Sequence, residues 1–236
     1  MSPKVSVIIP VKDCENTISR SISSVLEQSY NDYEVIVVDN NCSDKTIDRV
    51  KSFNSKKIRI IPCKTKGIVP ALNMGVSVAN GDYIARQDGD DYWYPQKLEK
   101  QVKLLNNNKN VHICGTQIRI VATDGEVVDD NFRYPVSDKA IKSWLLTGKN
   151  SIAHPSVIFR KDIFLRIGGY DDTYPIAEDH HLWLRCIKWF NFVNLPEVLL
   201  DYTSNTNPDY DPKFPLLASE AQFRVLSHMG FIKIAD

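Results

Sequence analysis

The sequence predicts an α/β fold whose central sheet is mostly parallel, with helices on its flanks and a small antiparallel element in its second half. Over residues 1–95, short runs rich in Val and Ile alternate with segments whose apolar residues recur at helical spacing. This alternation of strand and helix implies right-handed crossover connections, which join parallel strands. Beyond residue 95, the Asp124-Gly125 pair is a hairpin turn signal and predicts the antiparallel element.

The elements of the first half are predicted from these patterns. Two expected strands, at 5–9 and 34–38, are short, apolar and rich in β-branched residues, as strands buried on both faces are. Two more strands are expected at 58–61 and 82–85. Helices are expected where apolar residues recur on one face, at Ile18, Ile22, Val25 and Leu26, at Ile47, Val50 and Phe53, and at Val69, Leu72, Val76 and Ala79. We expect Asp13 or Asn16 to cap the first helix and Ser43 to cap the second.

The second half is expected to mix helices with antiparallel strands. The segment 178–190 is apolar nearly all round, so the helix predicted there should be buried. The other expected elements are a helix at 98–105, a strand at 111–121, a hairpin between 118–121 and 126–128, an irregular loop at 204–215 and a final helix at 216–229.

The composition disfavours several classes of protein. With 29 Lys and Arg against 29 Asp and Glu, the net charge is zero, which argues against broad nucleic-acid binding. No stretch reaches the ~20 consecutive apolar residues that span a bilayer, and residues 1–10 lack the pattern of a signal peptide. The five cysteines are scattered singly, which favours reduced thiols over disulfides or structural zinc. We therefore expect one continuous, cytoplasmic domain.

Polar clusters follow three of the expected parallel strands, at residues 10–13, 39–41 and 87–91. Ligands bind at the carboxyl ends of strands in such sheets, so we expect a binding site where the three clusters converge. The turn after the first strand contains no glycine, and no GxxxxGK[ST] motif occurs in the chain. A dinucleotide-binding site and a phosphate-binding P-loop are therefore disfavoured.

Residues 88–91 read Asp-Gly-Asp-Asp and place three carboxylates within four residues. Their mutual repulsion is unfavourable unless a cation or hydrogen-bond donors offset it. A hard divalent cation, with substrate phosphates completing its shell, fits these oxygen ligands. A solvated acidic turn is the alternative, but the position of the motif after an expected buried strand favours the cation.

Five motifs occur in order along the chain, at residues 7–10, 34–40, 73–75, 81–91 and 177–184. Together they resemble glycosyltransferase family 2, from about Val5 to Tyr202. The resemblance implies the GT-A fold, with a Rossmann-like sheet, and an inverting hexosyl- or N-acetylhexosaminyl-transferase that uses a nucleotide-diphosphate sugar. It also implies a single domain over 1–236, with a nucleotide-binding half at 1–95, a donor and acceptor half at 96–203, and a C-terminal loop and helix at 204–236.

The resemblance implies which residues hold the donor, which we expect to be a UDP-sugar. Pro10 and Val11 would line the nucleotide pocket through backbone atoms. Asp39 would accept a hydrogen bond from uracil, with a helix-capping or turn role as the alternative. Asp88 would contact the ribose or the sugar, and Asp90 would bind Mn²⁺ or Mg²⁺ together with Asp88.

Further residues match family positions near the donor. Lys66 lies in a loop that often contacts the donor, although an ordinary surface lysine would look the same, and Asn73 belongs to one of the five motifs. Arg86 would orient the sugar or phosphate, or else pair with Asp88 or Asp90. His154 matches a position near the sugar, with a structural role as the alternative. Asp91 is expected to cap the turn or helix that follows it.

The Glu178-Asp179 pair resembles the family's catalytic motif and opens the expected buried helix. The helix dipole and free amides would hold a carboxylate ionised there, and Asp179 would take the acceptor proton as general base. A helix-capping pair is the alternative. His180 and His181 point about 100° apart on a helix, so we expect packing or acceptor contacts from them rather than a shared metal.

The acceptor hydroxyl would belong to a glycan, a lipid-linked molecule or a protein, and contact with the cytosolic face of a membrane is left open. A sugar-1-phosphate nucleotidyltransferase is one rival, but it would need a glycine-rich, basic loop, which residues 11–15 do not provide. A non-catalytic nucleotide-sugar-binding member of the family is the other rival. Loss of Asp90 or Asp179 would favour it, and both residues are present.

Overall fold

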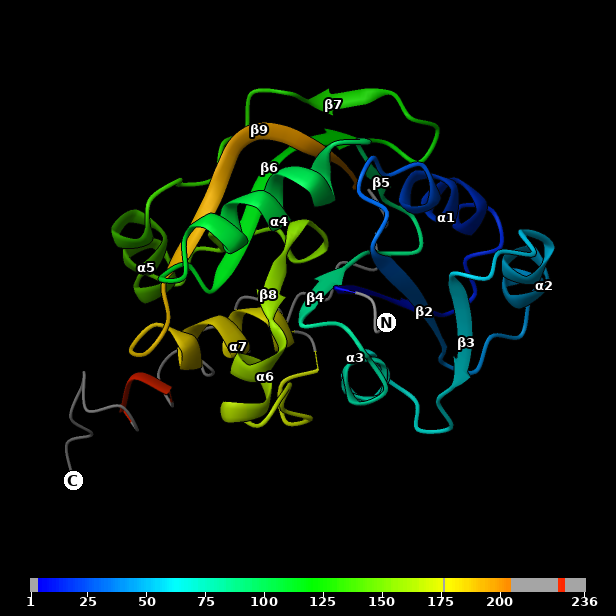
Figure 1. Ribbon diagram of the computed structural model, residues 1–236, viewed down its shortest axis with the longest axis horizontal. Coiled ribbons are helices and arrows are strands. Elements are labelled where there is room, and N and C mark those ends of the chain that lie inside the picture. Colours follow the sequence, from blue (N-terminus) through cyan, green and yellow to red (C-terminus); the bar gives the residue numbers. More distant parts are fainter. Residues whose placement is uncertain (1–3, 176, 205–224, 228–236) are drawn as a thin grey trace.

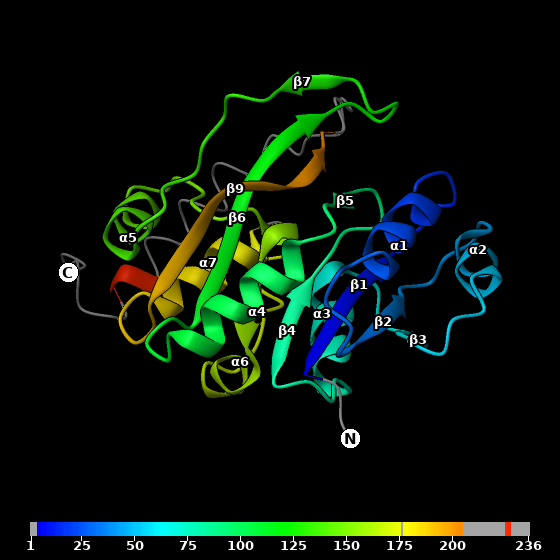
Figure 2. The same ribbon diagram turned by 45° about the horizontal axis from the view of Figure 1, so that its top comes forward.

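A mixed β-sheet runs through the computed structural model, which describes residues 4–175, 177–204 and 225–227. Within these residues the sheet has nine strands in the order β3-β2-β1-β4-β8-β6-β9-β5, with β7 paired to β6. Figure 1 labels all of these strands except β1, which is labelled in Figure 2. The strands are β1 (Val5–Val11), β2 (Tyr33–Asp39), β3 (Ile58–Pro62), β4 (Tyr83–Arg86), β5 (Tyr92–Trp93), β6 (Ile113–Val121), β7 (Val127–Asp129), β8 (Ile158–Arg160) and β9 (Phe192–Thr203).

Helices cover both faces of this sheet. They are α1 (Ile18–Leu26), α2 (Thr46–Ser52), α3 (Ile68–Ser77), α4 (Lys97–Asn107), α5 (Asp138–Leu146), the 3-10 turn η1 (His154–Ser156), α6 (Lys161–Arg166) and α7 (Glu178–Cys186). Side chains alternate between the two faces of a strand. In β1, Ile8 therefore packs in one core with Leu72 of α3 and Trp183 of α7, whereas Ile9 packs in the other core with Ile22 of α1. Burying each such Ile or Leu contributes roughly 1.5–3 kcal/mol.

The first four strands are parallel, as the sequence predicts. Strand β1 pairs in parallel with β2 on one side and with β4 on the other, and β2 pairs in parallel with β3. The second half brings in antiparallel pairs of β8 with β4 and β6, and a parallel pair of β6 with β9. In Figure 2, β6 and β9 run side by side as the two long strands of this half. The mostly parallel α/β sheet with an antiparallel element is confirmed.

The predicted hairpin is also present. Strands β6 and β7 pair antiparallel through Ile120 with Asp129 and Val121 with Val127. At the turn, Gly125 has a φ of +91°, a left-handed conformation that costs little without a Cβ. The side chain of Asp124 accepts a hydrogen bond from the N–H of Glu126 at 3.0 Å.

The predicted helix at 178–190 is too long, and the strand after it was not predicted. Helix α7 ends at Cys186, and the chain enters β9 at Phe192. A proline inside β9 made a long strand improbable, because proline cannot donate to the ladder. The register with β6 shifts between Thr116, opposite Leu195, and Gln117, opposite Val198. This irregularity places Pro196 outside the paired positions.

The predicted helix caps are wrong. Thr17 precedes α1, without a side-chain cap, while Oδ1 of Asp13 accepts hydrogen bonds from the N–H and hydroxyl of Ser43 at 2.6 and 3.1 Å. Helix α2 begins at Thr46, whose N–H donates to Asp44 at 2.9 Å. The side chains of Asp13 and Ser43 therefore form hydrogen bonds between the loops before α1 and α2 and do not cap these helices. The loop and helix predicted after Ser204 lie largely outside the described residues, of which 225–227 are helical.

The five cysteines are all free, as predicted. Among the described residues, none of the helices is both long and apolar enough to cross a bilayer.

Candidate active site

The register of the parallel strands brings the three polar clusters to one edge of the sheet. Val11 at the end of β1 lies opposite Asp39 at the end of β2, and Ile8 lies opposite Arg86 at the end of β4. The chain passes from β1 outward to β2 and β3 and then returns to the other side of β1 as β4. Ligands bind at such a switch point, because the loops after the two central strands diverge there.

A cavity of about 600 Å³ opens at this point, between the segment after β1 and the turn after β4. Three of the predicted site residues, Pro10, Asp88 and Asp90, contribute to its walls. The others that line it are Lys12, Asp13, Cys14, Glu15, Asn16, Thr17, Asp44, Gly89 and Thr123. The remaining predicted site residues are not among those that line it: Val11, Asp39, Lys66, Asn73, Arg86, His154, Glu178 and Asp179.

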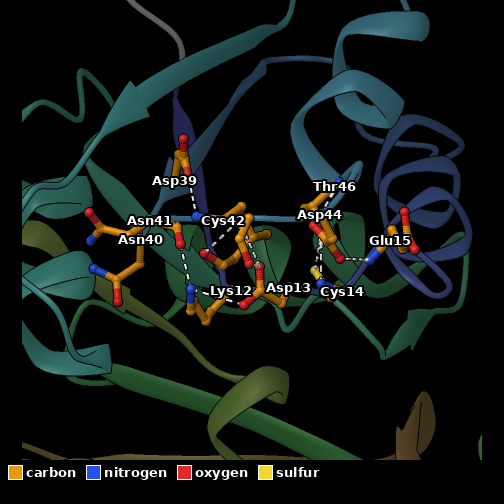
Figure 3. A network of polar contacts seen from close by, with 12 residues as sticks. Lys12, Asp13, Cys14, Glu15, Asp39, Asn40, Asn41, Cys42, Asp44 and Thr46 are labelled. Atoms are coloured by element: carbon orange, nitrogen blue, oxygen red, sulfur yellow. Dashed lines mark hydrogen bonds and ion pairs between the residues drawn. The ribbon is translucent and has the colours of Figure 1, made fainter.

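The loops after β1 and β2 lock each other in place (Figure 3). Besides the contact of Asp13 with Ser43, the N–H of Glu15 donates to Asp44 at 2.9 Å, and the N–H of Cys14 donates to the hydroxyl of Thr46 at 2.8 Å. The left-handed backbone of Asp13, with a φ of 46°, is held by these contacts. One wall of the cavity is therefore fixed before any ligand binds.

Asp39 and the residue after it shape the neighbouring region. Oδ1 of Asp39 accepts a hydrogen bond from the N–H of Cys42 at 2.9 Å, which is the turn role (Figure 3). Asn40 ties the loop before α3 to the end of β2, because its side chain donates to the carbonyl of Thr65 at 2.7 Å and accepts from the N–H of Gly67 at 2.9 Å. Lys66 lies exposed between these two anchors.

Three buried or half-buried carboxylates gather in the turn after β4. Asp88, Asp90 and Asp91 each present an oxygen within 4.8 Å of the others. Arg86, which is buried, forms an ion pair with Asp88. Asp91 accepts a hydrogen bond from the N–H of Thr203 in β9 at 2.7 Å. The expected cap by Asp91 is therefore wrong, since this carboxylate joins the turn to a strand that the sequence did not reveal.

Burial raises the pKa of two carboxyls in this turn. Burial, and then the charge of Asp88, raise the pKa of Asp90 to about 6. Burial, followed by the charges of Asp88 and Asp90, raises the pKa of Asp91 well above its ordinary value. The ion pair with Arg86 offsets the charge of Asp88, and the repulsion among the three carboxyls is only partly relieved by it.

A second pair of carboxylates lies at the start of α7. Oε1 of Glu178 lies 3.6 Å from Nδ1 of His154, and Oδ1 of Asp179 accepts a hydrogen bond from the N–H of His180 at 2.7 Å. Burial raises the pKa of Glu178, and burial together with the charge of Glu178 raises the pKa of Asp179. The expected effect of the helix terminus, a carboxylate held ionised, is thus outweighed by burial, which increases the proton affinity of both groups.

The two carboxylate groups share one buried cation. The charge of Arg86 counteracts the rise in the pKa of both Asp90 and Glu178, and after burial it helps to lower the pKa of His154 to about 3. The imidazole of His154 is therefore uncharged at neutral pH. Arg86 thus acts on both groups of acids.

The other predicted residues of this region have structural contacts. The side-chain amide of Asn73 pairs with the backbone of Tyr170 and not with the cavity. The ring of His181 stacks on Tyr174 with centroids 4.1 Å apart, and His180 is buried. Packing is what we expected of both histidines.

Comparison with known proteins identifies the chain. The profile described as Glycosyl transferase family 2 matches residues 6–168. The chain belongs to this family. It is 33% identical over 208 residues to the O-antigen biosynthesis glycosyltransferase WbnJ of Escherichia coli, covering 84% of this chain and 78% of WbnJ.

Three solved structures share the GT-A fold of this glycosyltransferase. S. aureus TarS 1-349 in complex with UDP-GlcNAc superposes with a TM-score of 0.76 at 17% identity, over 98% of this chain and 68% of that one. A longer TarS chain is matched over 40% of its length. The mannosyltransferase PcManGT from Pyrobaculum calidifontis, in complex with GDP-Man and Mn²⁺, gives a TM-score of 0.70 at 17% identity, over 100% of this chain and 66% of that one.

The acidic turn of this glycosyltransferase fits a divalent cation. Its oxygens are the hard donors that Mn²⁺ and Mg²⁺ accept, and they lie close together. Oδ2 of Asp91 is buried and has no hydrogen-bond partner among the described residues, an arrangement that is costly unless a ligand satisfies it. Asp88 and Asp90 border the cavity, so they are the ligands that a cation bound to substrate phosphates would meet.

Three residues of the site received no role of their own from sequence reasoning, although Asn40 belongs to the predicted polar cluster 39–41: Asn40, Tyr170 and Thr203. Each acts on an element distant in sequence, because Asn40 binds the loop before α3, Tyr170 contacts His154 at 2.7 Å, and Thr203 binds the acidic turn. For Asn40 a signal existed, since it directly follows a predicted site residue. Tyr170 and Thr203 gave none.

Proposed function

We propose that this glycosyltransferase moves a sugar from a UDP-sugar to an acceptor hydroxyl with inversion at the anomeric carbon. The observation that carries the proposal is the pair of half-buried acids at the start of α7, placed with the acidic turn around Arg86. The carboxylates of the acidic turn suit the binding of a cation, and those at the start of α7 suit the acceptance of a proton. Such a division matches a displacement in which a diphosphate leaves and a hydroxyl loses its proton.

The donor is proposed to bind along the edge of the sheet. Backbone atoms of Pro10 and Val11 would face the nucleotide, and Asp39 would accept the imide N–H of uracil through the carboxylate oxygen not used by Cys42. Asn40 anchors Thr65 and Gly67, the two neighbours of Lys66. The exposed side chain of Lys66 would contact the donor. TarS binds UDP-GlcNAc and PcManGT binds GDP-Man, so the nucleotide must be determined by direct comparison.

The diphosphate is proposed to lie at the acidic turn. Asp90 and Asp88 would hold Mn²⁺ or Mg²⁺, which, when bound, neutralises charge on the leaving diphosphate. Arg86, through its ion pair, keeps the carboxylate of Asp88 in place at the cavity. The same carboxylate would contact the ribose or the sugar.

Asp179 is proposed as the general base. The acceptor oxygen attacks the anomeric carbon from the face opposite the diphosphate, its proton moves to Asp179, and the bond from the anomeric carbon to the diphosphate oxygen breaks. A single displacement inverts the configuration and requires no covalent intermediate. The raised proton affinity of Asp179 suits this task, because a base works best with a pKa near the operating pH. The acceptor is proposed to be a glycan, a lipid-linked molecule or a protein, met in the cytoplasm.

The experiment is release of nucleoside diphosphate from a panel of UDP-glucose, UDP-GlcNAc and GDP-mannose, with Mn²⁺ or with EDTA. We expect slow release of UDP from a UDP-sugar that requires the cation and is lost in Asp179→Asn. Replacing the exposed Asp32 by Asn is the matched control and should leave the rate unchanged. Binding of UDP-sugars without release in any condition, or release of pyrophosphate from UTP and a sugar phosphate, would contradict the proposal.

A further inference from the structure

Tyr170 is linked through His154 to Glu178, the residue next to the proposed base Asp179. Its side chain is buried, and its hydroxyl lies 2.7 Å from Nε2 of His154. The other ring nitrogen of His154, Nδ1, lies 3.6 Å from Oε1 of Glu178. Tyrosine, histidine and glutamate thus form a line of polar contacts that ends next to Asp179.

The position of Tyr170 is fixed by its backbone. The side chain of Asn73 donates to the carbonyl of Tyr170 at 2.9 Å and accepts from its N–H at 3.0 Å. Gly169 has a φ of +76°, and a Cβ there would lie 2.8 Å from Oδ1 of Asn73, so the close approach depends on glycine. The ring of Tyr170 packs edge-on against Phe164 with centroids 5.3 Å apart. The hydroxyl is therefore held against the imidazole by a rigid frame.

The chemistry of the partners decides which nitrogen of His154 carries the proton. Burial raises the pKa of Tyr170 well above its ordinary value, so its phenol keeps its proton. A neutral imidazole has one donor and one acceptor nitrogen. Nδ1 faces the carboxyl of Glu178, and an ionised carboxylate can only accept hydrogen bonds. The arrangement that satisfies all three groups has N–H at Nδ1 and the tyrosine O–H donating to Nε2.

We propose that Tyr170 is a positioning residue: by donating to Nε2 of His154 it fixes the Nδ1–H tautomer, and this tautomer holds the ionised carboxylate of Glu178 beside Asp179. The inference rests on the proposed role of Asp179 as base. In the other tautomer the lone pair of Nδ1 would face the carboxylate and repel it. The charge of Glu178 matters because, after burial, it is what raises the proton affinity of Asp179. Tyr170 thus acts on the base through two intervening residues and touches no substrate.

The tautomer is measured by NMR on protein labelled with ¹⁵N in its histidines, because protonated and bare ring nitrogens have well-separated chemical shifts. His154→Gln identifies the His154 signals by their loss. We expect the wild-type protein to carry the proton on Nδ1. Tyr170→Phe keeps the ring and removes the hydroxyl, and it should give a mixture of the two tautomers. Its kcat for sugar transfer should fall by about three- to tenfold, the effect of one lost hydrogen bond, with an unchanged KM for the donor.

Tyr33→Phe is the matched control. The hydroxyl of Tyr33 donates to the carbonyl of Val25 at 2.8 Å, in the core that contains α1, whereas the buried apolar side chains of α7 belong to the other core. Its loss should lower the unfolding midpoint about as much as Tyr170→Phe does, while kcat and the His154 tautomer stay unchanged. A proton on Nε2 in the wild-type protein would overturn the inference, and so would Tyr170→Phe with an unaltered tautomer and kcat, or an equal fall of kcat in the control. If the wild-type protein transfers no sugar, the proposed function fails, whereas the tautomer still decides the direction of the hydrogen bond.

Discussion

The acidic turn after β4 and the acidic pair at the start of α7 both consist mainly of half-buried carboxyls, yet their surroundings differ. The turn gathers Asp88, Asp90 and Asp91 within 4.8 Å, and the guanidinium of Arg86 forms an ion pair with Asp88. At the start of α7, two carboxyls lie beside an uncharged imidazole and backbone amides. The first group therefore places three carboxyls in a small volume, whereas the second places two beside a neutral ring.

This difference indicates how one fold uses carboxylates for two tasks. Several carboxylate oxygens around a shared centre suit the binding of a divalent cation, for which the carboxylates must be ionised. A carboxyl whose proton affinity is raised by burial and by one neighbouring charge suits proton transfer. The account predicts that substitutions in the turn act on binding, whereas substitutions at α7 act on the chemical step.

The largest effect is expected from Asp179→Asn. The amide keeps the shape of the side chain and can still accept from the N–H of His180, so the fold and UDP affinity should survive. Transfer to the acceptor should fall by about 10²–10⁴-fold, the usual contribution of a general base. Higher pH should restore part of the rate, if hydroxide replaces the carboxylate. Transfer rates, thermal unfolding and UDP affinity are measured on the same samples.

Glu178→Gln is the control within the pair. The variant removes the charge that raises the proton affinity of Asp179 but leaves the base in place, so transfer should fall by about tenfold or less. Equal damage from both substitutions would leave the base unassigned. A drop in unfolding temperature that parallels the loss of rate in Asp179→Asn would show that Asp179 is structural.

An intermediate effect is expected from Asp39→Ala, which tests whether the nucleotide is recognised outside both acidic groups. Loss of a charged hydrogen bond should weaken UDP binding by roughly 1–3 kcal/mol and reduce discrimination against GDP. Asp39→Asn is the matched variant, since its Oδ1 can still accept from the N–H of Cys42 and preserve the turn. If Asp39→Ala weakens binding of UDP and GDP equally, and Asp39→Asn restores both, the residue serves only the turn.

The smallest expected effect is on stability, and it tests whether Asp90, in the acidic turn, carries an unfavourable negative charge when no cation is bound. The ordinary pKa of an aspartate, 3.8, applies to the unfolded chain, whereas burial and then the charge of Asp88 raise the pKa of Asp90 to about 6 in the folded protein. Between these values the folded state binds more protons, so the contribution of Asp90 to stability falls as pH rises through this window. Metal-free Asp90→Asn should therefore melt a few degrees above the wild-type protein at about pH 7.5, and the difference should vanish near pH 4.

Added Mn²⁺ should reverse this order at about pH 7.5, because only the wild-type turn keeps its full set of carboxylates. Differential scanning calorimetry of both proteins, with and without the cation, measures the four melting temperatures. A metal-free variant that melts below the wild-type protein at neutral pH would mean that hydrogen bonds within the protein, and not a cation, offset the charge of Asp90.

Much of the fold could be predicted from the sequence, because parallel strands buried on both faces are continuous apolar runs. The strands near residues 5–9 and 34–38 are such runs, and the Asp124-Gly125 hairpin has an equally local signal in its turn residues. Strand β9 was missed because Pro196 and Glu197 interrupt its pattern, and only the register shift against β6 shows how they are accommodated. The caps before α1 and α2 were missed because their candidate side chains bond across two loops.

For the site, the sequence indicated which residues gather but only some of the contacts between them. The acidic motif was evident from its position after an expected strand, and the Glu178-Asp179 pair from the resemblance to the family. The ion pair of Arg86 with Asp88 joins residues two positions apart and is one of the roles expected of Arg86. The contact of His154 with Tyr170 and the bond from Thr203 to Asp91 join segments farther apart. Contacts of this kind depend on tertiary packing, which no local pattern in the chain encodes.

The most direct test is calorimetric titration with UDP, with and without Mn²⁺, on the wild-type protein, Asp90→Asn and Asp179→Asn. If the turn binds the cation and the pair moves the proton, Mn²⁺ should increase the affinity for UDP strongly in the wild-type protein and to the same extent in Asp179→Asn. In Asp90→Asn the gain should be mostly lost, while the affinity in EDTA stays close to that of the wild-type protein. An equal gain from Mn²⁺ in all three proteins, or its loss in Asp179→Asn alone, would contradict the division of tasks between the two groups of carboxylates.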